Sequence, residues 1–128
     1  MGKKQANILI IEDDMALNQA YVTILSTAGY GVRSAFDGEE ALRLADELEP
    51  DIIFLDLRMP TMDGISFLKA YEPKTQHKDV KIIVFSNYDL QKEIDEAYDL
   101  GAQRYVLKAW ASPKELIKIV EYTLVGKK

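Results

Sequence analysis

Six charged or polar residues stand where apolar stretches of the sequence end, and their types suit metal and phosphoryl chemistry. They are three consecutive acids, one later acid, a serine and a lysine: Glu12, Asp13, Asp14, Asp56, Ser86 and Lys108. Carboxylates held together form a hard oxygen site of the kind Mg²⁺ prefers, and without a cation at least one of their pKa values should rise. A carboxylate can also attack phosphorus to form an acyl phosphate. A metal ion, an ammonium group and a hydroxyl would then offset the added negative charge.

Each of these residues also has an ordinary structural explanation when it is considered alone. A carboxylate at a strand end can solvate a loop or cap the next helix, serine is a common helix cap, and lysine is most often a solvated charge. Asp56 fits these explanations least, because Leu55 and Leu57 flank it. The chemical interpretation therefore depends on whether the fold brings the six residues together.

The elements that must position them begin with five short apolar runs, which we expect to be strands. They are Ile8 to Ile11, Val32 to Phe36, Ile52 to Leu55, Ile82 to Phe85 and Tyr105 to Leu107. Four are apolar at consecutive positions, which is typical of parallel strands buried on both faces. The run from Val32 to Phe36 alternates instead, which favours an edge strand.

Helical patterns separate these runs. The expected apolar stripes are Leu17, Tyr21, Ile24, Leu25 and Ala28; Ala41, Leu42, Ala45 and Leu48; Leu90, Ile94, Ala97 and Tyr98; and Leu116, Val120 and Leu124. Asp37 to Glu40 and Ser112 to Glu115 resemble capped helix starts, and Gly29 and Gly101 stand at expected helix ends. The remaining helix is less distinct; we expect it to begin near Asp63-Gly64 and to fray toward Pro73.

This order predicts an α/β fold with a strand–helix unit repeated five times, (βα)5. Parallel strands need crossover helices, which cover both faces of a doubly wound sheet. Such sheets bind their ligands at the carboxyl ends of the strands. The six residues all follow strands, so we expect them on this one rim.

Composition is consistent with this fold and narrows the function classes. The chain has 128 residues, 48% hydrophobic and 29% charged, which fits a single domain with an ordinary core. Its formal net charge of −5 argues against direct nucleic acid binding and against binding to anionic membranes. There are no cysteines, which excludes disulfides and thiolate metal sites, and no apolar stretch long enough to span a bilayer. We therefore expect a cytoplasmic protein.

The sequence resembles the receiver domains of two-component response regulators from about Asn7 to Leu124. The resemblance rests on Ile8 to Asp14, Asp51 to Pro60 with Met62-Asp63-Gly64, Lys81 to Ser86, Gly101-Ala102 and Tyr105 to Lys108. It implies a flavodoxin-like sheet with strand order 2-1-3-4-5. It also implies one receiver domain over residues 1–128, with its core at about 7–124.

The resemblance assigns a role to each candidate residue. Asp56 is similar to the phosphoacceptor, Asp13 to a direct metal ligand, and Glu12 to an acid that acts partly through water. Mg²⁺, or Mn²⁺, would be bound by these acids and by the main-chain carbonyl of Arg58. Ser86 is similar to the switch hydroxyl and Lys108 to the lysine that pairs with the phosphoryl group. Tyr105 matches the aromatic residue that turns inward on switching; the alternative is an edge aromatic that only packs.

The implied function is signalling by a phosphoprotein rather than enzymatic turnover. A sensor histidine kinase or a phosphotransfer protein would donate the phosphoryl group to Asp56, and the domain would assist its own phosphorylation and dephosphorylation. The fourth helix, fifth strand and fifth helix would form the output face for a downstream partner, which the sequence does not identify. We expect a monomer or a phosphorylation-linked dimer.

Three other functions share some of these features. A haloacid-dehalogenase-like phosphatase also uses an aspartate nucleophile, but it has a second Asp two places later, where this chain has Arg58. A degenerate receiver would lack the acceptor or the metal acids, and all are present. A flavodoxin would offer hydroxyls and backbone N–H groups to phosphate in its first loop, whereas Glu12, Asp13 and Asp14 would repel it without a metal ion.

The sequence departs from the receiver pattern after the lysine, where Lys108-Ala109-Trp110 replaces the usual proline. A non-proline cis bond costs about 2.5–4 kcal/mol, so we predict a trans Lys108–Ala109 bond. A trans bond could shift Lys108 and weaken its hold on the phosphoryl group. We also expect Trp110, the only tryptophan, near the site.

Four residues receive a further interpretation. Arg58 and Tyr88 stand two places after Asp56 and Ser86, and two large side chains there would shield an acyl phosphate from water. They therefore predict slow self-dephosphorylation. Asp14 is interpreted as a favourable charge at a helix N-terminus. His77, the only histidine, is interpreted as a loop residue rather than a ligand or phosphodonor.

Overall fold

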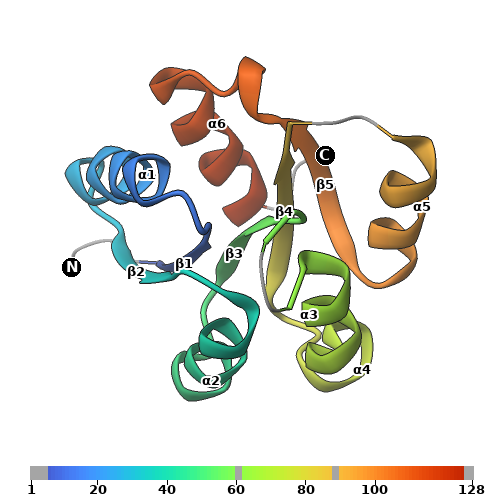
Figure 1. Cartoon of the computed structure of the whole chain (residues 1–128). Coiled ribbons are helices and arrows are strands. Elements are labelled where there is room, and N and C mark those ends of the chain that lie inside the picture. Colours follow the sequence, from blue (N-terminus) through green and yellow to red (C-terminus); the bar gives the residue numbers. More distant parts are fainter. Residues whose placement is uncertain (1–5, 60–61, 88–89, 126–128) are drawn as a thin grey trace.

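The chain forms a five-stranded parallel sheet with helices on both faces (Figure 1). The computed structural model describes residues 6–59, 62–87 and 90–125. The strands are β1 (Asn7–Ile11), β2 (Gly31–Ala35), β3 (Ile52–Asp56), β4 (Lys81–Ser86) and β5 (Ala102–Leu107). Their order in the sheet is β2-β1-β3-β4-β5, so the flavodoxin-like order is confirmed, and β2 is the predicted edge strand.

Alternate residues of the central strands supply two separate cores. Leu9, Ile11, Ile53 and Leu55 belong to the core under one set of helices, α2 (Gly38–Leu48), α3 (Gly64–Tyr71) and α5 (Gln91–Asp99). Ile8, Ile10, Ile52 and Phe54 belong to the core under α1 (Met15–Thr27) and α6 (Pro113–Leu124). The central strands therefore have no polar face, which is why they read as continuous apolar runs.

The third crossover differs from the sequence prediction, because it contains two helices. The predicted start at Asp63-Gly64 is confirmed, but α3 ends at Tyr71 rather than fraying, and Pro73 begins the short α4 (Pro73–Gln76). Glu72 joins them in a left-handed conformation with φ of 55°. Proline at the first helical position has no N–H to lose and has its φ preset for a helix, so it restarts the helix after this break.

Side chains cap four of the helices at their N-termini. Asp14, Asp37, Asp63 and Ser112 each accept a hydrogen bond from the backbone N–H three residues later. The interpretation of Asp14 as a favourable charge at a helix start is thereby confirmed. At the start of α2 the Glu40 carboxylate bonds back to the N–H of Phe36, so its reciprocal bond falls one residue before the cap. These caps fix where each crossover leaves the rim of the sheet.

Three large side chains of the predicted apolar stripes are exposed. Leu124 at the end of α6 is 41% exposed. Leu90 and Tyr98, which were expected to share an apolar stripe with Ile94 and Ala97, are 50% and 43% exposed. Leu90 lies one residue before α5, and within α5 only Ala97 is fully buried. This helix packs on β5, an edge strand, and on α3, so it leaves part of its apolar surface uncovered. Among the described residues, no helix combines the length and apolarity needed to cross a membrane.

Candidate phosphoryl-transfer site

The predicted acids meet at the carboxyl edge of the sheet. Glu12 and Asp13 follow β1, Asp56 ends β3, and β1 and β3 are neighbours. One carboxylate oxygen from each of the three lies within 4.8 Å of the others. Glu12 and Asp56 are buried, whereas Asp13 is exposed. The set of oxygen donors fits Mg²⁺ or Mn²⁺, and the exposed Asp13 leaves one side of the cluster accessible to water or a phosphoryl group.

Lys108 reaches this cluster from the end of β5. Its Nζ lies 2.6 Å from Glu12 Oε1 and 3.3 Å from Asp56 Oδ2. Burial by itself would lower the pKa of Lys108, but the two carboxylates outweigh burial, so its pKa is raised and the ammonium remains charged. The predicted trans Lys108–Ala109 bond is confirmed, since the described residues contain no cis peptide bond. Lys108 contacts Asp56 with this bond trans.

The pKa of Glu12 depends on the same kinds of effect, but here burial outweighs the charged neighbours. Burial raises the pKa of its carboxyl group more than the Lys108 ammonium and the hydrogen bond from the Asp14 N–H lower it. Its Oε1 is buried and lies 2.6 Å from Lys108 Nζ, so the ammonium is the cation that this oxygen faces among the described residues. A buried carboxylate needs such a cation beside it.

The Asp56 carboxylate is held on both sides. Oδ1 accepts a hydrogen bond from the Arg58 N–H at 3.2 Å, and Oδ2 faces Lys108. Gly64 lets the start of α3 approach the backbone of Asp56 and Leu57 closely. A Cβ at that position would lie 2.7 Å from the Asp56 carbonyl oxygen and 2.7 Å from Leu57 Cα. The Gly64 N–H donates to the Leu57 carbonyl at 3.0 Å, which holds this close approach.

Asn18 is a supporting residue that the sequence reasoning missed. It is buried in α1, and its amide donates to the carbonyl oxygens of Glu12 at 2.9 Å and Ala35 at 3.2 Å. Its Oδ1 accepts from the Ser34 hydroxyl. Asn18 therefore ties the ends of β1 and β2 together directly before Asp13. The available signal was its spacing, since it shares the buried face of the helix with Tyr21 and Leu25.

Ser86 ends β4, the strand next to Asp56, and Tyr105 lies on β5, one strand further out. Ser86 is fully buried at the end of β4, beside Leu107 in the sheet register. Tyr105 is half-buried and lines an apolar hollow of about 370 Å³ between α5 and β5. We call this hollow the aromatic pocket; its lining is Ile94, Tyr98, Tyr105, Val106, Leu107 and Trp110. Trp110 is 75% exposed, so it lines this pocket rather than a closed active site. The switching role of Ser86 and Tyr105 stays a prediction.

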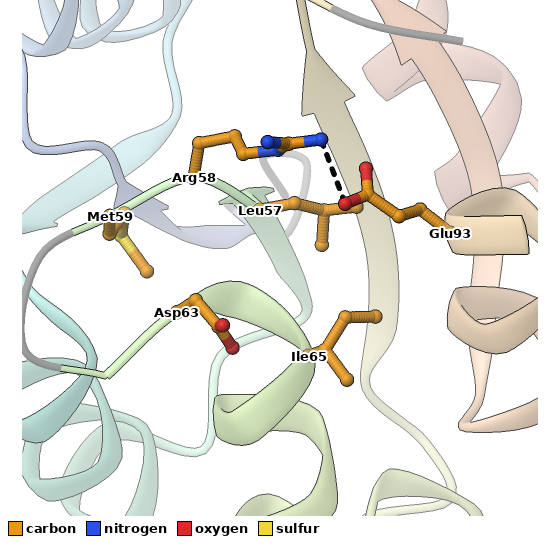
Figure 2. Close-up of a pocket in the computed structure, with 6 residues that line it drawn as sticks. All are labelled: Leu57, Arg58, Met59, Asp63, Ile65 and Glu93. Carbon is orange, nitrogen blue, oxygen red and sulfur yellow. Dashed lines mark ion pairs between the residues drawn. The ribbon is translucent and has the colours of Figure 1, made fainter. Parts of the chain in front are cut away.

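Arg58 turns its side chain toward α5. Its Nη2 lies 2.9 Å from Glu93 Oε2, and Figure 2 shows the guanidinium reaching across to Glu93 above a pocket bounded by Leu57, Asp63 and Ile65. Glu93 is another residue that the sequence reasoning missed. Tyr88, the second predicted shielding residue, lies outside the described residues.

His77 lies far from these groups, at the opposite edge of the sheet, where it precedes β4. Its ring stacks on Tyr71 at 3.9 Å, and its nitrogens lie 3.5 Å from Asp46 Oδ1 and 3.4 Å from Glu49 Oε2. Burial, together with these two acids, raises the pKa of the Tyr71 hydroxyl far above its usual value. The loop interpretation is confirmed, because His77 directly follows α4, but the side chain is more enclosed than a loop position suggested.

Comparison with known proteins supports one family. The model of the response regulator receiver domain matches residues 8–121. The structure of chemotaxis protein CheY4 from Vibrio cholerae superposes with a TM-score of 0.85 at 30% identity, covering 92% of this chain and 98% of that one. The receiver domain of a putative response regulator NarL from Mycobacterium tuberculosis gives 0.85 at 26% identity, covering 98% of this chain and 100% of that one.

Curated relatives are longer than this chain. The transcriptional regulatory protein YdfI of Bacillus subtilis is 36% identical over 107 residues, which is 82% of this chain and 49% of YdfI. The nitrate/nitrite response regulator NarL of Escherichia coli is 32% identical over 127 residues, 98% of this chain and 57% of NarL. The chain thus spans about half the length of these relatives. With the strand order, the acidic cluster and the family match in agreement, the chain belongs to the receiver domains of two-component response regulators.

Proposed function

We propose that Asp56 accepts a phosphoryl group from a sensor histidine kinase or a phosphotransfer protein, in a reaction that depends on Mg²⁺ or Mn²⁺. The observation that carries the proposal is the meeting of Glu12, Asp13 and Asp56 with Lys108 at the carboxyl edge of the sheet. A carboxylate nucleophile, a cation site and a charged ammonium within contact distance are the groups this transfer requires.

In the proposed reaction an oxygen of the Asp56 carboxylate attacks phosphorus. The bond between phosphorus and the donor's histidine nitrogen breaks, and that nitrogen keeps the electron pair. Lys108 would balance the charge added to Asp56. Ser86, at the end of the strand next to β3, would donate a hydrogen bond to the phosphoryl group. Asp13, Asp56 and the Arg58 carbonyl would hold the metal ion, with Glu12 nearby, and the ion would supply further charge neutralisation. The same groups would let the domain assist its own dephosphorylation.

We further propose that phosphorylation changes the conformation of the face formed by α5, β5 and α6. Tyr105 would turn inward when this face switches. A phosphoryl group shifts this face only by as much as it favours one conformation over the other. A downstream partner would bind this face, and the domain would act in the cytoplasm as a monomer or as a dimer formed on phosphorylation. The 128 residues would form one domain with its core at about 7–124, whatever else accompanies it in a longer regulator.

The test is phosphorylation by acetyl phosphate with Mg²⁺, followed by intact mass. We expect a gain of one phosphoryl group that disappears without Mg²⁺ and in Asp56→Asn, and that remains in the control Asp79→Asn, an exposed aspartate before β4. Trp110 fluorescence should change in the same titration, because its ring lines the aromatic pocket beside β5. Magnesium binding without an adduct, also in the presence of a kinase, would contradict the proposal and favour a degenerate receiver.

A further inference from the structure

An ion pair connects the segment after the candidate acceptor to α5. Arg58 Nη2 and Glu93 Oε2 are 2.9 Å apart, with side chains 47% and 27% exposed. Arg58 begins beside the acceptor, because its N–H donates to Asp56 Oδ1. Glu93 lies in the first turn of α5, and its second oxygen, Oε1, is buried without a hydrogen-bond partner in the described parts of the chain. The backbone of Arg58 therefore contacts Asp56, whereas its guanidinium contacts α5.

Among the described residues, two negative groups can attract this guanidinium. One is the Glu93 carboxylate, which contacts it in the structure. The other is the acceptor, which becomes more negative when it carries a phosphoryl group. An exposed ion pair contributes at most about 1 kcal/mol, so neither partner holds Arg58 exclusively, and a change at one shifts the population at the other.

We propose that Glu93 is a positioning residue for the lifetime of the phosphoryl group. By holding Arg58 against α5, it keeps this large side chain from covering the acyl phosphate and so leaves the phosphorus accessible to water. This inference rests on the proposed function of Asp56 and makes it more specific. It also changes the prediction of slow self-dephosphorylation, because the Arg58 shield is drawn aside by a residue that the sequence did not reveal.

A second ion pair to α5 provides a control. Lys69 on α3 and Glu96, one turn further along α5, form a second ion pair at 3.6 Å. It attaches the same helix, α5, but to α3, and its side chains are more exposed, at 62% and 40%. Neither residue neighbours Asp56 in the sequence. Loss of either pair weakens the attachment of α5, whereas only loss of the first changes the position of Arg58.

The experiment measures the decay of the phosphorylated protein by intact mass, after removal of acetyl phosphate, in wild type, Glu93→Gln, Glu96→Gln, Arg58→Ala and the double variant Arg58→Ala/Glu93→Gln. We expect Glu93→Gln to lengthen the half-life roughly two- to fivefold, the range that loss of an exposed pair allows. Glu96→Gln should match wild type. The effect of Glu93→Gln should vanish in the Arg58→Ala background, which a purely structural role of Glu93 in α5 would not produce.

The outcomes separate this inference from the function on which it rests. An adduct that decays equally in wild type and Glu93→Gln would overturn the inference alone. So would a lengthening that persists without Arg58, since Glu93 would then act by its own charge or through the helix. Absence of any adduct in wild type, with acetyl phosphate and with a kinase, would overturn the proposed function and the inference together.

Discussion

Replacing Asn18 with alanine tests how strongly the fold holds the loop that carries Glu12 and Asp13, the candidate metal ligands. The side-chain amide of Asn18 donates two hydrogen bonds, to the carbonyl oxygens of Glu12 and Ala35, and accepts one from Ser34. Each such bond contributes about 0.5–1.5 kcal/mol net, so losing three costs about 3 kcal/mol. The Ala35 oxygen keeps its bond from the Glu12 N–H, and alanine is a better helix former by about 0.6 kcal/mol. The expected loss of unfolding free energy is therefore about 2 kcal/mol.

Urea unfolding followed by circular dichroism measures this loss. With a slope of about 2 kcal/mol per molar urea, the midpoint should fall by about 1 M at unchanged slope. Gln19→Ala is the control, because Gln19 is exposed on the same helix turn and should change stability by less than about 0.5 kcal/mol. Mg²⁺ affinity of Asn18→Ala should also fall, by about tenfold, as for other residues that orient metal ligands. A midpoint equal to that of Gln19→Ala would refute the reasoning that this network holds the rim.

Three other perturbations have defined outcomes. Gly64→Ala places a Cβ 2.7 Å from the Asp56 carbonyl oxygen and from Leu57 Cα, so it should destabilise the fold by about 1–3 kcal/mol and slow phosphorylation; a wild-type melting temperature would contradict this. Burial raises the pKa of Glu12, and a protonated carboxyl is a poor metal ligand, so Mg²⁺ affinity should fall as the pH drops through that raised pKa. Mg²⁺ titrations at several pH values would show this fall. Glu12→Gln should make the Mg²⁺ affinity less dependent on pH. Tyr71→Phe removes a buried hydroxyl that has no hydrogen-bond partner among the described residues, so thermal unfolding should show neutral or slightly increased stability, and a loss above about 1 kcal/mol would reveal a partner.

The strands and the residues at the carboxyl edge were predictable because a buried parallel sheet requires a simple pattern of apolar and polar residues. Strands buried on both faces must be continuously apolar, and polar residues that follow them must meet at one edge. Asp56 and Lys108 were placed in this way. The start of β5 was missed because Gln103 and Arg104 are polar, which an edge strand permits, and because the register with β4 shifts beside Ile82.

Other features depended on contacts that spacing does not encode. The break between α3 and α4 follows from the left-handed Glu72, and glutamate is not a residue that signals this conformation. The Arg58–Glu93 pair joins a loop to a helix 35 positions later through flexible side chains. The exposure of Leu124 and Tyr98 depends on what the neighbouring elements leave uncovered, and helical periodicity does not report this.

The arrangement of the rim has a consequence for any partner of the α5–β5 face. Two connections run from the candidate acceptor to the aromatic pocket. One passes through Arg58 to Glu93, which immediately precedes the pocket-lining Ile94. The other passes through Lys108, which directly follows β5 and stands two residues before Trp110. Coupling between two binding sites is reciprocal, so if phosphorylation at Asp56 changes affinity for a partner at the pocket, that partner must change the free energy of phosphorylation by the same factor. A partner that contacts Glu93 should therefore also change the phosphoryl lifetime, because it competes for the group that positions Arg58.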